Sequence, residues 1–119
     1  PACVYSHPPC AGVGLTEDAA RQRGHTLRVG RFALQGNGKA IAIGEPAGFV
    51  KTVFDASSGA LLGAHLVGPE ATELIHGFTL AGTLEATEAE LIETVFPHPT
   101  LSEAMHESVL AAFGRALHS

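Results

Sequence analysis

The order of local structural signals predicts an α+β domain, with an antiparallel sheet and helices packed on one face. Strand signals dominate the first 67 residues, apart from one short helix near the start, and helical periodicity dominates from residue 69 onward. Strands followed by helices are typical of this class, and strands joined by a local turn pair antiparallel. The length of 119 residues, with no internal repeat or linker, predicts a single domain over residues 1–119.

The first quarter of the chain carries signals for strand segments and one helix. Residues 3–5 begin a short strand, the breakers at 7–9 interrupt it, and residues 13–15 are its expected continuation. A helix is expected after Thr16, because a hydroxyl caps a helix and the acids that follow favour its first turn. Gly24 is expected to end this helix.

The middle of the chain predicts three strands. Residues 26–34 are rich in β-forming side chains, and Gly30 is expected to mark a bulge or bend. Residues 36–43 hold a Gly-Asn-Gly turn signal and then a short apolar stretch of ambiguous structure. Residues 48–55 and 60–67 are strands, and the Asp-Ala-Ser-Ser-Gly sequence between them predicts a hairpin.

The last part of the chain predicts three helices. The first is expected to be capped by Gly68, with Pro69 as its first helical residue. A capping box at Thr87 predicts a short helix that continues to Val95. The third helix shows apolar residues four apart: Leu101, Met105, Val109, Phe113 and Leu117.

Composition excludes several classes of function. The net charge is −5, and the 7 Lys and Arg residues form no cluster, which argues against nucleic-acid binding. No apolar run approaches the roughly 18 residues of a membrane span. With 45% apolar and 16% charged residues, the domain is expected to bury one face against a partner. The start at Pro1 is expected to reflect a piece of a longer protein.

The cysteines and most histidines give no sign of a metal or redox site. Cys3 and Cys10 have neither CxxC nor zinc spacing, and we expect them to be reduced thiols. No two histidines have HExxH spacing, so no metal is expected. No G-x-G-x-x-G, Walker or G-x-S-x-G sequence is present.

His98 and Glu103 are the best candidates for chemistry. Because His98 precedes a proline, its backbone is expected to be extended. If Thr100 caps the last helix, Glu103 is its third residue, and its carboxylate reaches back toward the residues before the helix. A hydrogen bond to His98 would then fix the ring and its tautomer, and a thiol of pKa about 8.5 would be a natural proton donor to it. Taken singly, Glu103 could be only a capping residue and His98 only a loop histidine.

Eight short motifs resemble one family in their order and spacing. They lie at residues 3–5, 13–17, 37–40, 48–51, 62–65, 67–71, 73–75 and 98–104, and the last is the most specific. With these motifs the chain resembles the C-terminal dimerisation domain of the pyridine nucleotide–disulfide oxidoreductases, most closely the dihydrolipoamide dehydrogenase branch. The resemblance covers nearly the whole chain.

This resemblance implies a role for the pair. In the family, the histidine at the position of His98 is the acid/base of thiol–disulfide exchange, and the glutamate at the position of Glu103 orients it. Two cysteines of an FAD domain form a redox-active disulfide that dihydrolipoamide attacks, and the electrons pass to FAD and then to NAD. The histidine comes from the opposite subunit of a homodimer, and the backbone of His98 and Pro99 approaches the flavin.

The resemblance also implies a context. The FAD and NAD domains would belong to a parent flavoprotein, and the domain of residues 1–119 alone is expected to be inactive and to bind neither cofactor. The parent's partner would be the lipoyl domain of a 2-oxo acid dehydrogenase complex or of the glycine cleavage system. Its location would be the cytoplasm of a bacterium, or the mitochondrial matrix of a eukaryote.

The sequence departs from the family pattern at two places, and two alternative functions remain. Pro9 and Cys10 follow Pro8 where many relatives carry a glutamate, and Phe96 stands where many carry a second histidine. Neither change affects His98 or Glu103. The alternatives are a dimerisation module without a catalytic role, and the same domain from another disulfide reductase such as glutathione reductase.

Overall fold

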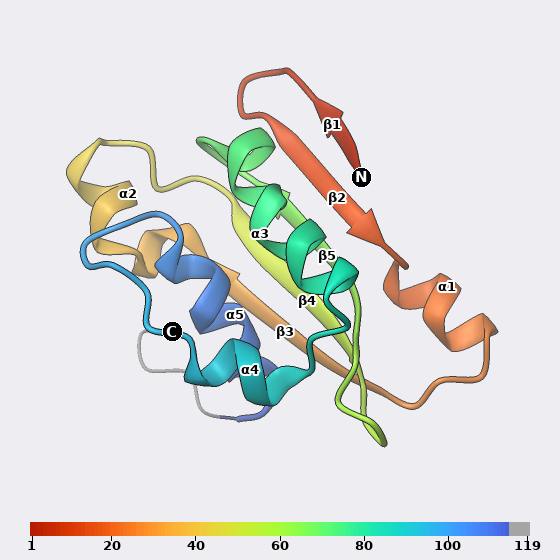
Figure 1. The fold of residues 1–119 in the computed structure, drawn as a ribbon. Coiled ribbons are helices and arrows are strands. Elements are labelled where there is room, and N and C mark those ends of the chain that lie inside the picture. The colour runs from red at the N-terminus through yellow and green to blue at the C-terminus, as the bar shows by residue number, and fades with distance from the viewer. Residues whose placement is uncertain (115–119) are drawn as a thin grey trace.

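The computed structural model describes residues 1–114, which form one sheet and a set of helices (Figure 1). The strands are β1 Ala2–Val4, β2 Cys10–Gly14, β3 Leu27–Ala33, β4 Phe49–Asp55 and β5 Leu61–Val67. The helices are α1 Glu17–Gln22, α2 Gly38–Ala42, α3 Ala71–Thr83, α4 Glu88–Glu93 and α5 Glu103–Ala112, with a 3-10 turn, η1, at Leu34–Gly36.

The sheet is antiparallel throughout, in the order β1-β2-β5-β4-β3. The hairpin between β4 and β5 forms because Asp55 ends β4 with a turn of its own. Its carboxylate accepts hydrogen bonds from the backbone N–H groups of Ser57 and Ser58, at 2.8 and 2.9 Å. The predicted α+β class with an antiparallel sheet is confirmed.

Helices α3 and α5 cover one face of the sheet and enclose the core, α3 over β2 and β5 and α5 over β3 and β4 (Figure 1). Residues alternate between the two faces of a strand, and the alternate positions Val50, Thr52 and Phe54 of β4 point toward this layer. The largest fully buried side chains of the core are Phe54, Phe78, Val50, Val53 and Val109. Lys51, at an intervening position of β4, points to the other face, where its ammonium lies 2.7 Å from the carboxylate of Glu17 of α1.

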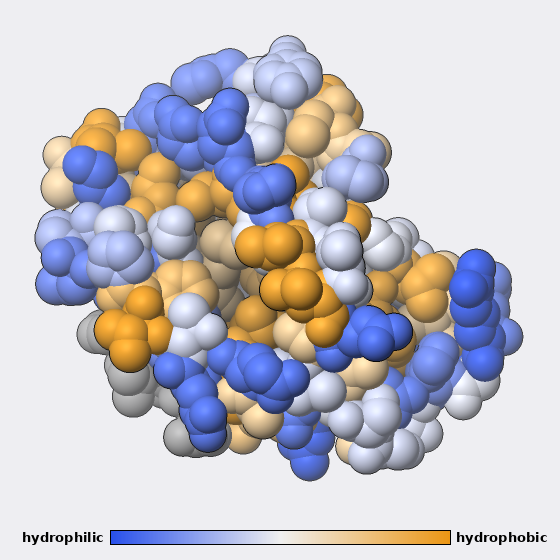
Figure 2. Space-filling view, viewed as in Figure 1, coloured by the Kyte–Doolittle hydropathy of each residue, from blue (hydrophilic) through white to orange (hydrophobic). Residues whose placement is uncertain are grey.

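The helix layer leaves apolar side chains at its outer surface, as Figure 2 shows over the helices. Leu80 and Leu84, at the end of α3, are 50% and 70% exposed, and Val95, after α4, is 92% exposed. An apolar hollow of about 340 Å³ lies between α3 and α4. Such a surface agrees with the expectation that the domain buries a face against a partner.

Gly30 does not form the predicted bulge. It pairs in regular register with Thr52, and the sheet irregularity lies between Val53 and Phe54 instead. Helix α5 approaches β3 so closely that a Cβ on Gly30 would overlap the backbone carbonyl oxygen of Ser108. The glycine is therefore required by the close contact of helix and sheet and not by a bend in the strand.

Residues Gly38–Ala42 form the helix α2, where the sequence predicted a turn at 36–38 and left the apolar stretch after it ambiguous. Asn37 caps α2, because its Oδ1 accepts the backbone N–H of Ala40 at 2.8 Å, and asparagine is among the best N-cap residues. The apolar stretch that follows is helical and buries Ala40.

The boundaries of the last three helices also differ from the predictions. Glu70, in a left-handed conformation with φ 61°, precedes α3, so neither Gly68 nor Pro69 takes its predicted place. The capping box of Thr87 and Glu90 is present, but α4 ends at Glu93 because Thr94 has extended backbone. Helix α5 begins at Glu103, since Leu101 and Ser102 form a turn, and Leu117 lies outside the described residues.

Candidate functional site

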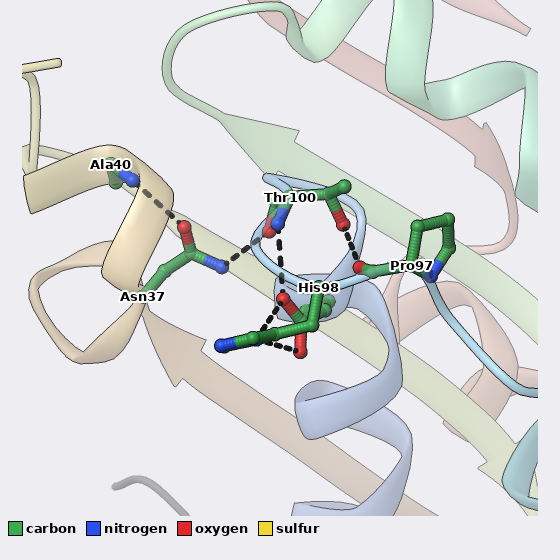
Figure 3. A network of polar contacts seen from close by, with 6 residues as sticks. Asn37, Ala40, Pro97, His98 and Thr100 are labelled. Carbon is green, nitrogen blue, oxygen red and sulfur yellow. Dashed lines mark hydrogen bonds and ion pairs between the residues drawn. The ribbon is translucent and has the colours of Figure 1, made fainter. Parts of the chain in front are cut away.

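The segment from Pro97 to Thr100 connects the end of α4 to the start of α5 and presents His98 at the surface. The His98–Pro99 peptide bond is cis, and Thr100 Oγ1 donates a hydrogen bond to the carbonyl of Pro97 at 2.7 Å. Figure 3 shows this small loop with the His98 ring projecting from it. The His98 side chain is 77% exposed, so one edge of the ring is open to a molecule from outside.

The predicted hydrogen bond between His98 and Glu103 is present. Nδ1 of His98 lies 2.9 Å from Oε1 and 3.0 Å from Oε2 of the Glu103 carboxylate. Because an ionised carboxylate can only accept, Nδ1 carries the proton of this contact. In the neutral ring, Nε2 then holds a free lone pair, and it points away from Glu103 (Figure 3).

Glu103 is itself held in place by the loop. Its Oε1 also accepts the backbone N–H of Thr100 at 3.0 Å. Glu103 is the first residue of α5, where the positive end of the helix dipole favours a carboxylate. The reach back to Thr100 is the predicted one, although the N-cap of α5 is Ser102 and not Thr100.

Asn37 belongs to the site, although the sequence placed it in a turn and in the 37–40 motif without giving it a role. Its side chain is 4% exposed and joins two elements. Nδ2 donates to the backbone carbonyl of Thr100 at 3.0 Å, while Oδ1 accepts from Ala40 of α2 (Figure 3). The N-cap preference of asparagine before Gly38 was the signal that could have revealed the helix, but the sequence holds no signal for the bond to Thr100.

A hollow of about 220 Å³ opens beside the pair and includes Asn37 in its wall. Its lining comes from β3, from the region of η1 and α2, from the loop before α5 and from α5 itself: Phe32, Gly36, Asn37, Gly38, Ile41, His98, Glu103 and Glu107. Glu107, four residues after Glu103 on α5, is 6% exposed and adds a second carboxylate to this wall. Sequence reasoning gave no role to Glu107.

Three other histidines are engaged away from the site. His25 Nδ1 lies 2.6 Å from the carboxylate of Asp55. The pKa of this carboxyl falls to about 2, because it accepts hydrogen bonds from the N–H of Ser58, from His25 and from the N–H of Ser57. His65 Nε2 contacts the carbonyl of Leu15 at 3.2 Å, and His106 Nε2 contacts that of Ile92 at 2.8 Å. Residues 1–114 contain no group of three or more His, Cys, Asp or Glu that could hold a metal ion.

The two cysteines lie far from the pair in the sheet. Cys3 is on β1 and Cys10 on β2, and both are free thiols. These strands form the edge opposite to β3, which leads into η1 and α2 beside His98. The described chain therefore offers an exposed, carboxylate-held imidazole for proton transfer, and any thiol that it serves must come from another molecule or domain.

Comparison with known families gives a direct match. The family model of the pyridine nucleotide-disulphide oxidoreductase dimerisation domain matches residues 1–109. The chain belongs to this family. The resemblance inferred from the motifs is thus confirmed.

The curated relatives indicate to which branch of the family the chain is most similar. The chain is 68% identical over 118 residues to a dihydrolipoyl dehydrogenase of Zymomonas mobilis, covering 99% of this chain and 25% of that protein. It is 57% identical over 119 residues to a dihydrolipoyl dehydrogenase of Rhizobium etli, covering 100% of this chain and again 25% of the relative. The chain is thus a dimerisation domain of dihydrolipoyl dehydrogenase-like disulfide oxidoreductases, and it spans about a quarter of their length.

Solved structures have the same fold. LpdA from Mycobacterium tuberculosis superposes with a TM-score of 0.84 at 30% identity, covering 91% of this chain and 24% of that chain. The HOCl-induced flavoprotein disulfide reductase RclA from Escherichia coli gives 0.86 at 25% identity, covering 91% and 25%. No helix among residues 1–114 is long and apolar enough to cross a membrane.

Proposed function

We propose that this domain forms the interface of a dihydrolipoyl dehydrogenase and that His98 and Glu103 are its acid/base pair. The observation that carries the proposal is the hydrogen bond of 2.9 Å between Nδ1 of His98 and Glu103, together with the 77% exposure of the His98 side chain. The full-length protein would contain FAD and NAD domains outside residues 1–119. Relatives at 68% and 57% identity, both dihydrolipoyl dehydrogenases, support this substrate over that of another disulfide reductase.

The chemistry assigned to the pair is a proton transfer. Oxidation of the dithiol of dihydrolipoamide to a disulfide releases two electrons and two protons. As the first thiol attacks the redox-active disulfide, Nε2 of His98 takes its proton, because Glu103 holds the neutral ring with the proton on Nδ1. FAD and NAD, held by other domains of the full-length protein, would supply the acceptors for the electron pair. Glu103 keeps the ring aimed and stabilises the charge that forms on it.

The exposure of the pair agrees with a site shared between subunits. Within residues 1–114 neither His98 nor Pro99 is covered, so a cofactor-bearing domain of a second subunit can lie against both. A homodimer in which each subunit lends His98 to the other would bury this surface, and exposed Leu80 and Leu84 add apolar area for association. The lipoyl domain of a 2-oxo acid dehydrogenase complex or of the glycine cleavage system would deliver the substrate.

The test is His98→Gln in the full-length protein. Loss of an acid/base group slows catalysis about 10²- to 10⁴-fold, and we expect a fall of this size in dihydrolipoamide turnover with FAD still bound. The control is His76→Gln, which removes an exposed histidine of α3 and is expected to leave turnover unchanged. Normal turnover of His98→Gln at normal FAD content would contradict the proposal and favour a dimerisation module without a catalytic role.

A further inference from the structure

We infer that Asn37 is a positioning residue for His98, which it aims by holding the backbone of Thr100. This inference rests on the proposed function. Asn37 touches neither His98 nor Glu103 in the hydrogen-bond network of Figure 3, so its effect must pass through the loop. At 4% exposure, Asn37 shows little of its surface to the hollow beside His98, although it forms part of the wall.

The orientation of the Asn37 amide is determined by its partners. Oδ1 faces a backbone N–H, that of Ala40 at 2.8 Å, which can only donate. Nδ2 faces a backbone carbonyl, that of Thr100 at 3.0 Å, which can only accept. The reversed amide would place like groups against each other at both ends, so one side chain both caps α2 and donates to the loop.

The bond from Asn37 is the hydrogen bond that ties the His98 loop to α2, while Phe96 of the loop stacks on His106 of α5 with ring centroids 5.0 Å apart. Among the hydrogen bonds of residues 1–114, the others made by residues 95–100 stay within the loop or go to Glu103. Thr100 links the bond from Asn37 to the bonds that hold His98. Its carbonyl accepts from Asn37, and its N–H donates to the Glu103 carboxylate that holds His98. A movement of Thr100 therefore displaces both members of the pair.

The expected cost follows from the sensitivity of catalysis to geometry. A displacement of about 1 Å in a catalytic group can slow a reaction about 10²-fold. Without the Asn37 donor, the loop loses its link to α2, and the lone pair of His98 Nε2 is no longer held in one direction. Among the described residues, the titratable groups that line this hollow with His98 are Glu103 and Glu107, so an aspartate at position 37 adds a third carboxylate there and a serine adds no charge.

Two variants separate the loop bond from the helix cap. Asn37→Asp keeps an oxygen that can accept the N–H of Ala40, and aspartate is as good an N-cap as asparagine, but the donor to Thr100 is lost. Asn37→Ser also keeps a capping oxygen, is uncharged, and is too short to reach Thr100. The matched control is Thr16→Ala, which removes the N-cap of α1, a bond of 3.1 Å to Ala19, away from the site.

The decisive experiment is a double-mutant cycle in the full-length protein, with FAD content and melting temperature as checks on folding. We expect Asn37→Asp and Asn37→Ser to lower kcat for dihydrolipoamide by about 10- to 100-fold, with KM within about twofold and Thr16→Ala active. In a His98→Gln background, the same changes at position 37 should have no further effect, because a residue that acts through His98 has nothing left to position.

The outcomes distinguish the two proposals. If His98→Gln retains turnover, the proposed function fails. If His98→Gln is slow but both Asn37 variants keep full kcat, or if their losses multiply with that of His98→Gln, the inference about Asn37 fails alone. A further readout does not need turnover: ¹⁵N NMR of neutral His98 should show mainly the Nδ1–H tautomer, and Asn37→Ser should shift this toward a mixture. An unchanged tautomer ratio would contradict the inference.

Discussion

The close contact between β3 and α5 makes Gly30→Ala a severe test of the packing described for this fold. The added Cβ would overlap the carbonyl oxygen of Ser108 and lie 2.7 Å from the backbone nitrogen and 2.9 Å from the Cβ of Ala112. All three atoms belong to α5, so a change of rotamer cannot relieve the clash. The helix that carries Glu103 must move away from the sheet.

The magnitude of the effect has two parts. Overpacking of a tight core costs about 1–3 kcal/mol. Movement of α5 also stretches the buried bonds of Ser108 Oγ, which donates to the Gly30 carbonyl at 3.2 Å and lies 3.0 Å from Thr52 Oγ1. A buried polar group left without a partner costs about 1–3 kcal/mol. We therefore expect Gly30→Ala to lower the free energy of unfolding by about 2–6 kcal/mol, a large share of the ~5–15 kcal/mol of a typical domain.

The assay is urea unfolding of the 119-residue chain, followed by circular dichroism. Gly82→Ala is the matched control, because Gly82 lies in α3 with open space at the position of a Cβ. That change should be neutral or stabilising by up to about 1 kcal/mol, since alanine favours a helix over glycine. A loss below about 1 kcal/mol for Gly30→Ala would refute the close approach of α5 to the sheet.

Two further predictions concern stability in acid and association. The pKa of Asp55 falls from an ordinary value near 3.8 to about 2 in the folded chain, so its stabilising effect is full above about pH 5 and is lost as the pH falls toward 2. The difference between the urea midpoints of the natural chain and Asp55→Asn should be constant above pH 5 and shrink below pH 4; a difference independent of pH would contradict this. Analytical ultracentrifugation should show self-association of the chain, and a strict monomer at high concentration would argue against a preformed dimer face.

The geometry of the His98–Glu103 pair was predictable because it is local. A residue before proline is extended, and a glutamate near the start of a helix reaches back toward the preceding residues. Both tendencies act within six residues of sequence, and the bond of 2.9 Å is present even though α5 begins later than predicted. The hairpin between β4 and β5 was predictable for the same reason, since its turn depends on Asp55 and its immediate neighbours.

The parts that sequence reasoning missed depend on contacts between distant residues. The bond from Asn37 to Thr100 spans 63 positions, and that from Ser108 to Gly30 spans 78. No periodicity or cap signal reports such a pair. Gly30 illustrates the difficulty, because a glycine within a strand suggests a bulge equally well as a close neighbour, and only the packed helix decides between them.

The most direct measurement of the central claim uses hybrid dimers of the full-length protein. One subunit carries His98→Gln with intact redox cysteines, and the other carries His98 with those cysteines replaced. If His98 serves the site of the partner subunit, the hybrid contains one complete site and should turn over dihydrolipoamide, although each parent homodimer is nearly inactive. A hybrid as inactive as its parents would show that His98 does not act across the dimer.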